Sequence, residues 1–179
     1  MSRSEVGANG SLPPALSVEV AVECQGWRRA CPKAAALARA AAVAAFRGAA
    51  AEARFSPPAR AVIGVTLTDA AHQRELNRTW RGRDASTNVL SFPLAGTDAP
   101  PPGAPLLLGD VVLALETVAA EAADQNKPVA DHLRHLVVHG VLHLLGRNHE
   151  EAAEAHAMER CETAILSELG VPDPYSDII

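Results

Sequence analysis

Apolar and polar residues alternate in parts of the chain, which is typical of strands with one buried face. The clearest alternation is "SVEVAVE" at 17–23, where polar residues separate valine and alanine. "RAVIGVTLT" at 60–68 is a continuous apolar, β-branched run and predicts a buried strand. Two shorter runs predict further strands, "NVLSF" at 88–92 and "LLLGDVVLAL" at 106–115. The pattern therefore predicts about four strands.

Helices are predicted between these strands and after the last one. Alanine, the strongest helix former, dominates 32–54. "DAAHQRELNRTW" at 69–80 predicts a short helix with Asp69 as its N-cap. Further helices are predicted at 115–126, from Lys127-Pro128 to Leu145, and from about 149 to 169. The chain shows no internal repeat and is typical of a small α+β or α/β domain with about five helices.

Length and composition fit one globular domain. Of the 179 residues, 48% are hydrophobic, and we expect 17–179 to form a single domain behind a disordered tail at 1–16. Lys33, Arg39 and Arg47 interrupt the alanine-rich segment, so no membrane span is expected there.

Net charge and cysteine content bear on the possible partners and on the redox environment of the protein. The net charge of −5 argues against a broadly basic nucleic-acid-binding surface but not against a local basic patch. The three cysteines, Cys24, Cys31 and Cys161, are odd in number and show no paired short spacing. This favours a reduced protein of the cytoplasm.

The segment "HGVLHLLGRNH" at 139–149 carries the clearest chemical signal. His139 and His143 are one helical turn apart and can present ring nitrogens to one point. A third ligand must come from chain that has turned back, because a zinc–nitrogen bond is only about 2.0–2.1 Å long. Gly146 is suited to end the helix, and His149 beyond it can swing toward the pair. We therefore predict one zinc ion per chain, held by these three histidines with a fourth position open for water, as in catalytic sites.

The flanking residues complete this prediction. Asn148 and Glu151 have the spacing of an N-cap with its capping-box partner, which would start the last helix near His149. His135 lies one turn before His139 and is the best candidate for a supporting role. The remaining histidines are expected to be structural or on the surface: His72, His132 and His156.

"NRTWRGRDASTNVLSFP" at 77–93 gathers arginines around Trp80. Guanidinium groups bind phosphate bidentately, so the cluster predicts a phosphate contact. The alternative is a solvated loop in which arginines pair with carboxylates such as Asp84. Thr87, Asn88 and Ser91 could bind substrate or hold the turn. The arginines are Arg78, Arg81 and Arg83.

A metal that activates water beside a phosphate-binding arginine points to phosphodiester hydrolysis. A peptidase is the competing interpretation, because HxxxHxxGxxH is the spacing of metzincins. Those enzymes have a glutamate as general base where this chain has Gly140, and Met158 is not placed for their methionine turn.

Several motifs together resemble the bacterial YbeY family of endoribonucleases and ribosomal RNA maturation factors. They are "STNVLSFP", "LLGDVVLAL", "HLVVHGVLHLLGRNHE" and "ELGVPDPY", and the resemblance extends from about 17 to 175. It implies an α+β fold whose small mixed sheet has three parallel strands and one antiparallel strand. It also implies zinc on His139, His143 and His149, and a functional arginine at Arg81.

The same resemblance implies a biological role. Family members cleave single-stranded RNA, act in maturation of the 16S ribosomal RNA 3′ end and take part in ribosome quality control. The implied partners are ribosomal RNA, the small ribosomal subunit and its assembly factors, in the cytoplasm. An alternative to the nuclease is a ribosome assembly factor with a structural zinc and little nuclease activity. The family usually has Tyr-Asp where this chain has Arg147-Asn148. Asparagine keeps the capping ability of aspartate but has no carboxylate for acid–base chemistry.

Overall fold

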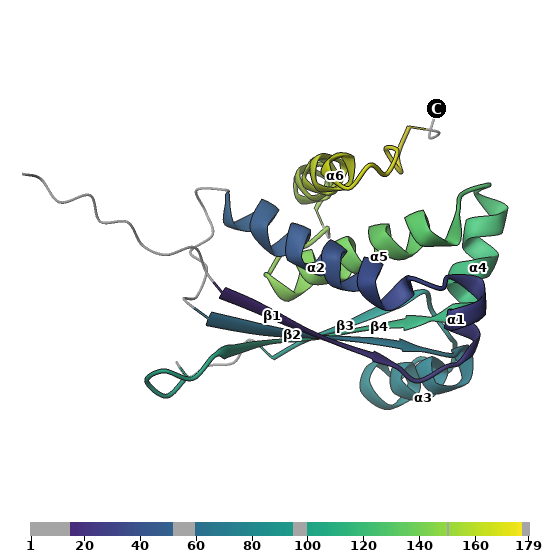
Figure 1. Ribbon diagram of the computed structural model, residues 1–179, viewed down its shortest axis with the longest axis horizontal. Coiled ribbons are helices and arrows are strands. Elements are labelled where there is room, and N and C mark those ends of the chain that lie inside the picture. The colour runs from purple at the N-terminus through teal and green to yellow at the C-terminus, as the bar shows by residue number, and fades with distance from the viewer. Residues whose placement is uncertain (1–14, 52–59, 95–99, 150, 177–179) are drawn as a thin grey trace, which may run out of the picture.

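The computed structural model describes residues 15–51, 60–94, 100–149 and 151–176. Its centre is a four-stranded sheet with strand order β1-β2-β4-β3 (Figure 1). Strands β1, β2 and β4 are parallel, and β3 is an antiparallel edge strand paired with β4. The strands are β1 (Ala15–Val22), β2 (Arg60–Thr68), β3 (Val89–Pro93) and β4 (Leu106–Ala114). The implied α+β fold and mixed sheet are confirmed.

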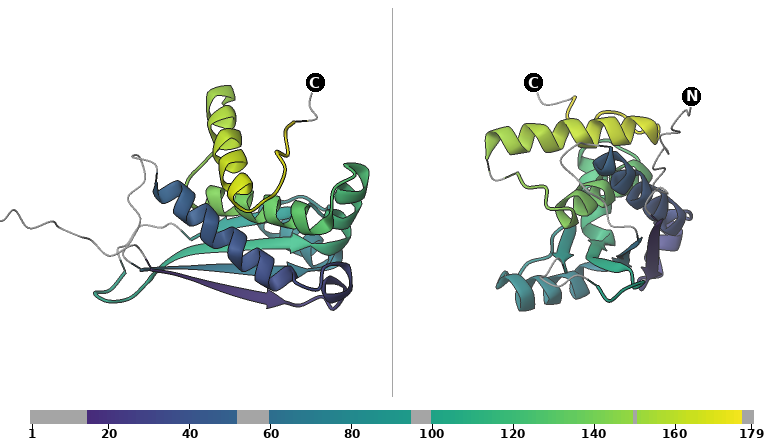
Figure 2. Two further views of the ribbon diagram at one scale, coloured as in Figure 1. Left: turned by 45° about the horizontal axis from the view of Figure 1, so that its top comes forward. Right: turned by 90° about the vertical axis from the view of Figure 1, so that its left-hand side faces the viewer.

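Six helices are present in the described part of the chain, one more than predicted. The additional helix, α1, is a single short turn of helix that precedes the alanine-rich one. Helices α2 and α5 lie on one face of the sheet and α3 on the other, while α6 packs over α2 and α5 (Figures 1 and 2). The helices are α1 (Gly26–Ala30), α2 (Ala34–Ala50), α3 (Ala70–Arg81), α4 (Leu115–Asp124), α5 (Val129–Leu144) and α6 (Ala152–Glu168).

The predicted periodicities explain this layering. In β2, alternate residues Ile63, Val65 and Leu67 are fully buried beneath the helices. The inner face of α2 is built almost entirely of alanine, and these small side chains let the helix lie close to the sheet. No helix in the described ranges is both long and apolar enough to cross a membrane.

Helix α5 is the element that positions the site. It contacts α2, α4, α6, β3 and β4, and its apolar face is buried in the core. Gly140 allows the closest approach to the sheet, since a Cβ atom there would lie 2.6 Å from Cγ1 of Val111. The histidines lie along the flank of α5, so the packing of the helix fixes their positions.

Most boundaries agree with the sequence predictions, and one cap does not. Asp69 caps α3 as predicted, accepting from the backbone N–H of His72 at 2.9 Å. The predicted capping box of Asn148 and Glu151 is wrong. Glu151 itself is the N-cap of α6 and makes no side-chain cap bond. The Asn148 side chain accepts from the backbone N–H of His149 at 2.8 Å, so it stabilises the loop that returns His149 toward α5.

Two other predictions fall partly outside the described residues. The predicted tail at 1–16 is wrong for its last two residues, which begin β1 because their backbone pairs with β2. Positions 1–14 lie outside the described residues, as do positions 52–54 of the predicted alanine-rich helix.

Candidate metal centre

The three histidines of the predicted metal site lie together at the C-terminal end of α5. The Nε2 atoms of His139 and His143 are 3.1 Å apart. The ring centroid of His149 lies 5.6 Å from that of His139 and 5.0 Å from that of His143. One nitrogen from each ring can be chosen so that all three lie within 4.8 Å of one another. This is the only group of three or more potential ligands found among the described residues.

Gly146 produces the turn that brings His149 back. Its φ is 81°, in the left-handed region that glycine adopts without steric cost. The N–H of Gly146 donates to the carbonyl of His143 at 3.0 Å, and the N–H of Arg147 donates to the carbonyl of Leu142 at 3.0 Å. These two bonds form the helix-ending motif that glycine favours at this position. The predicted role of Gly146 is confirmed.

The partners of the other ring nitrogens orient the first two histidines. His139 Nδ1 lies 2.8 Å from Oε1 of Glu162, and His143 Nδ1 lies 2.9 Å from the carbonyl oxygen of Arg147. A carboxylate and a carbonyl only accept, so both Nδ1 atoms carry the proton. When both rings are neutral, their Nε2 lone pairs face each other, an arrangement that suits a cation between them.

Burial lowers the pKa of His143 below its ordinary value, and the neighbouring ring of His139 lowers it further. The ring is therefore held in the neutral form that binds metal. His139 and His143 are half-buried and His149 is exposed, so the group is open to solvent on one side. The donor set and its open side fit a zinc ion with one position free.

Glu162 of α6 is the centre of a buried hydrogen-bond network behind His139. Its side chain is 1% exposed and also contacts Nε2 of His135 at 3.0 Å and the hydroxyl of Tyr175. Burial would raise the pKa of Glu162, but the bonds from His135, His139 and Tyr175 outweigh it and lower the pKa to about 2. Glu162 is therefore a carboxylate that fixes the ring of His139.

Sequence reasoning missed Glu162 and Tyr175. A signal was present in α6, where the buried positions are Met158, Glu162, Ile165 and Leu166. A glutamate in an otherwise apolar helical stripe needs a buried partner. His135 bonds to Glu162, and its ring also lies edge-on to that of His139 with centroids 6.5 Å apart. Its supporting role stays a prediction.

The histidines form one wall of a cleft between α5 and the edge strand β3. Its volume is about 460 Å³, and Arg81 at the end of α3 lies on its rim. Arg81 Nη2 donates to the carbonyl of Ser91 at 3.1 Å. The lining residues are Arg81, Asn88, Val89, Ser91, Pro93, His139, His143, Asn148 and His149. The structure thus places the predicted arginine and the predicted ligands around one space.

The other arginines of the cluster differ from Arg81. Arg78 pairs with Glu75 at 2.9 Å, which agrees with the solvated-loop alternative for this residue. Asp84 pairs with Arg74 rather than with an arginine of the cluster. Arg83 is exposed, and its side chain makes no ion pair or hydrogen bond within the described ranges.

Asn88 and Ser91 hold the cleft wall in place. Asn88 Nδ2 donates to both carboxylate oxygens of Glu121 at 2.9 and 3.2 Å, and its Oδ1 accepts from the N–H of Val89. Ser91 Oγ donates to the carbonyl of Gly140 at 3.2 Å, which ties β3 to α5. Both residues support the turn, one of the two roles expected from the sequence.

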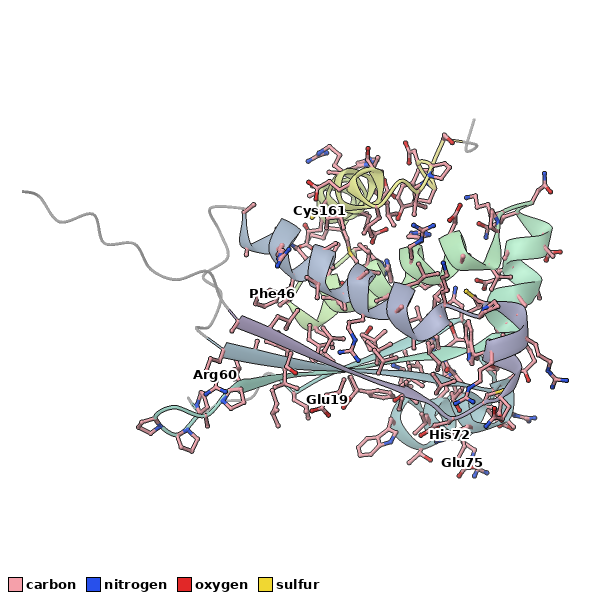
Figure 3. All side chains as sticks on the ribbon, viewed as in Figure 1. Glu19, Phe46, Arg60, His72, Glu75 and Cys161 are labelled. Atoms are coloured by element: carbon pink, nitrogen blue, oxygen red, sulfur yellow. The ribbon has the colours of Figure 1, made fainter. Side chains whose placement is uncertain are left out.

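The remaining histidines do not join the metal group. His72 on α3 contacts Glu23 at 3.0 Å and lies on the far side of the sheet from Cys161 of α6 (Figure 3). His156 is exposed on α6 and contacts Glu159 at 3.4 Å. His132 is buried on α5 and contacts Glu121 at 2.7 Å.

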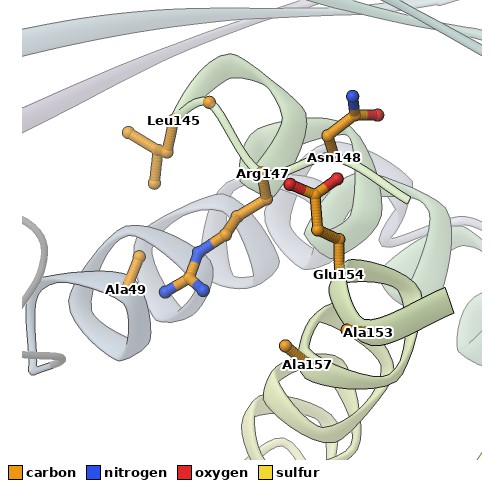
Figure 4. A pocket seen from close by; sticks show the side chains of 8 residues that line it. Ala49, Leu145, Arg147, Asn148, Ala153, Glu154 and Ala157 are labelled. Carbon is orange, nitrogen blue, oxygen red and sulfur yellow. The ribbon is translucent and has the colours of Figure 1, made fainter. Parts of the chain in front are cut away.

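Arg147 lies beside the metal group in sequence, but its side chain lines a different hollow. That hollow has a volume of about 410 Å³ and lies between α2 and α6, where Ala49, Glu154 and Ala157 also contribute (Figure 4). The guanidinium extends away from Asn148 along the hollow (Figure 4). The backbone carbonyl of Arg147 therefore bonds to Nδ1 of His143 in the metal group, while the guanidinium charge of Arg147 lies outside the cleft.

Comparisons with known proteins agree on one family. A family model described as "Endoribonuclease YbeY" matches residues 32–170. Proteins named Endoribonuclease YbeY from Paramagnetospirillum magneticum and Azorhizobium caulinodans are 50% and 48% identical to this chain. The first alignment covers 90% of this chain and 98% of the relative, and the second covers 90% and 97%.

A solved structure gives an independent view of the fold. The solution structure of TM1509 from Thermotoga maritima matches with a TM-score of 0.54, covering 90% of this chain and 97% of that one. The sequence identity is 22%, so this likeness bears on the fold alone.

Proposed function

The chain belongs to the YbeY endoribonuclease family, and we propose that it is a zinc-dependent endoribonuclease acting on single-stranded RNA. The observation that carries the proposal is the cleft that Arg81 shares with His139, His143 and His149. Three imidazoles and a guanidinium around one solvent-accessible space suit a phosphodiester better than a neutral substrate. The proposed ion content is one zinc per chain.

In the proposed mechanism His139, His143 and His149 hold the zinc. Zinc with three imidazole ligands and an open position lowers the pKa of water toward about 7 and polarises a phosphoryl oxygen. Glu162 and the Arg147 carbonyl keep the Nδ1 protons of His139 and His143 in place, so that Nε2 of each ring remains a ligand.

Arg81 binds the scissile or adjacent phosphate in this mechanism. Ser91 accepts from one Nη atom and thereby fixes the guanidinium at the rim, while other N–H donors remain for the phosphate. The positive charge stabilises the negative charge that builds up on the phosphoryl oxygens during cleavage.

The structure argues against the peptidase alternative. Gly140 occupies the position of the metzincin glutamate, and a Cβ there would lie 2.6 Å from Val111 and 3.1 Å from Ser91 Oγ. A larger side chain at that position would require Val111 to shift. The lining residues of the cleft in the described ranges include no carboxylate that could act as the base.

We propose the biological setting from family membership. The single domain that begins with β1 at Ala15 would be a nuclease that acts in maturation of the 16S ribosomal RNA 3′ end and in ribosome quality control. Its partners would be ribosomal RNA, the small ribosomal subunit and assembly factors, in the cytoplasm. The alternative of a structural zinc fits less well, because the ligand group faces a cleft rather than a closed core.

Metal analysis and an RNA cleavage assay on the same purified sample test the proposal. We expect about one zinc per chain and cleavage of single-stranded RNA that chelator abolishes and zinc restores. His149→Ala should lower zinc occupancy, whereas the matched control His156→Ala, at an exposed histidine of α6, should not. Equal occupancy in the two variants would refute the ligand assignment. Peptide hydrolysis with inert RNA would instead support the peptidase.

A further inference from the structure

Trp80 is the most exposed large apolar side chain in the described part of the molecule. It is 70% exposed in the last turn of α3, whereas Trp27, the second tryptophan, is 0% exposed and bonds to the carbonyl of Thr68. The core therefore does not need Trp80. Aromatic side chains that remain in solvent while touching another ring are typical of recognition surfaces.

Trp80 packs against Phe92 of β3, and we name these two residues the aromatic pair. Their ring centroids are 6.4 Å apart and their planes meet at 64°. Phe92 follows Ser91, and successive side chains of a strand point to opposite faces. Ser91 faces the metal cleft and α5, so Phe92 and the aromatic pair lie on the outer face of the sheet.

Arg81 connects the aromatic pair to the cleft. It directly follows Trp80 and donates to the carbonyl of Ser91, the residue that precedes Phe92. Because β3 is the edge strand, a chain leaving the cleft past Arg81 crosses one strand before it reaches the pair. Trp80 and Arg81 are consecutive, so their Cα atoms are about 3.8 Å apart, and the aromatic pair begins directly beside the arginine that lines the cleft.

The charges around the aromatic pair favour a nucleobase over a phosphate. Arg83 is exposed near the end of α3, and its side chain has no ionic partner among the described residues. Asp110 pairs with Phe92 in the strand register, is exposed and lies over Gly64 on the outer face. A carboxylate there repels phosphate, whereas the arginines beside the pair attract the backbone of the same strand.

We propose that the aromatic pair is a stacking subsite for a base next to the scissile phosphate of an RNA bound in the metal cleft. This inference rests on the proposed function and adds a determinant of its substrate. A base can stack on Trp80 only when it is unpaired and splayed from its neighbours. The subsite therefore favours single strands, and it tolerates different bases because every base has a π-face.

The test measures stacking separately from cleavage, on zinc-loaded protein. The binding probe is a 2′-O-methyl phosphorothioate oligouridylate of about eight nucleotides, which resists cleavage. We expect Trp80→Ala to weaken its binding about tenfold, as for loss of one stacked base. Trp80→Phe should retain most of the affinity, whereas Trp80→Leu should resemble Trp80→Ala. Leu107→Ala is the matched control, since Leu107 of β4 is, like Trp80, an exposed large apolar residue.

Fluorescence and abasic substitution identify the stacked base. The probe should quench the emission of Trp80, and no quenching should remain in Trp80→Phe, where only buried Trp27 emits. Replacing one nucleotide after another by an abasic unit should weaken binding to the unmodified protein at one position. At that position the abasic unit should not weaken binding to Trp80→Ala any further.

Failure of the inference and failure of the proposed function are distinguishable. If the unmodified protein cleaves RNA, and Trp80→Ala binds the probe and cleaves RNA equally well, the stacking subsite is overturned and the nuclease proposal stays intact. Inert RNA in the presence of zinc, with Trp80 still quenched by the probe, would overturn the nuclease proposal alone. Rescue of binding by Trp80→Leu would overturn stacking in favour of an apolar contact, as a protein partner would make.

Discussion

Two of the histidine–glutamate pairs on helix α5 have different surroundings. In its N-terminal half, His132 contacts Glu121 at 2.7 Å, and in its C-terminal half, His139 contacts Glu162 at 2.8 Å. His132 is 4% exposed, and its Nδ1 atom is buried with no hydrogen-bond partner among the described residues. The second nitrogen of His139 lies 3.1 Å from Nε2 of His143, and both histidines line an open cleft.

The difference shows that the carboxylate partner alone does not make a histidine functional. The accessibility of the second ring nitrogen decides whether the histidine is functional, because a metal or substrate must reach that atom. At His132 that nitrogen is enclosed, so the pair ties α5 to α4 and, through Glu121, to Asn88 of the cleft wall. At His139 the buried carboxylate lies behind the ring and the free nitrogen lies in front.

The largest expected effect comes from removing one histidine of each pair. His139→Ala should lower RNA cleavage to the level of the metal-free protein and reduce zinc occupancy, because a ligand is lost. His132→Ala should keep zinc and most activity but lower the free energy of unfolding by about 1–3 kcal/mol, since a buried hydrogen bond is lost. Zinc content, cleavage rate and urea unfolding of both variants make the comparison. Loss of zinc in His132→Ala but not in His139→Ala would reverse it.

Variants of Arg81 test whether the cleft gives the C-terminal half of α5 its function. Arg81→Ala should reduce cleavage by about 10²-fold or more while zinc content and fold stay intact, because the charge on the phosphoryl group loses its partner. Arg81→Lys should restore activity only in part, since lysine lacks the planar fork. The control is Arg78→Ala, on the same helix but paired with Glu75. Cleavage rates at matched zinc content decide, and a larger loss in the control would place the phosphate contact elsewhere.

The two glutamates provide a smaller and more specific test. Glu162→Gln keeps the size of the side chain but removes the charge that orients His139, so zinc affinity should fall about 10- to 100-fold. Glu121→Gln is the matched change in the other pair and should leave zinc affinity unchanged. Competition with a chromophoric chelator measures both affinities. Equal affinities in the two variants would show that the Glu162 carboxylate does not support the metal.

These pairs also show which features the sequence could predict. His139, His143, Gly146 and His149 lie within one short segment, so helix and turn geometry alone bring them together. Glu162 lies 23 residues from His139, and its contact depends on how α6 crosses α5, which no local pattern encodes. The capping-box prediction for Asn148 is wrong for a related reason. The loop must return His149 to α5, and this tertiary requirement outweighed the capping-box spacing.

The smallest expected effect is a pH dependence of stability that belongs to the buried pair. Burial lowers the pKa of His132 below its ordinary value, although Glu121 acts in the opposite direction. The unfolded state therefore takes up a proton near pH 6.5 while the folded state does not. Stability from His132 is present above that pH and is lost as pH falls toward the lower pKa of the folded state, by at most about 1.4 kcal/mol per pH unit.

Urea unfolding of chelator-treated protein between about pH 7.5 and 5.5 measures this loss. Glu162 does not contribute in that window, because its pKa is lowered from 4.5 to about 2 and it stays ionised in both states. His143 contributes equally to the unmodified protein and to His132→Gln, so the difference between them isolates His132. The unmodified protein should lose more stability on acidification than His132→Gln. Equal losses would mean that the enclosed histidine titrates as freely as one in solvent, and the contrast between the two halves of α5 would then not extend to protonation.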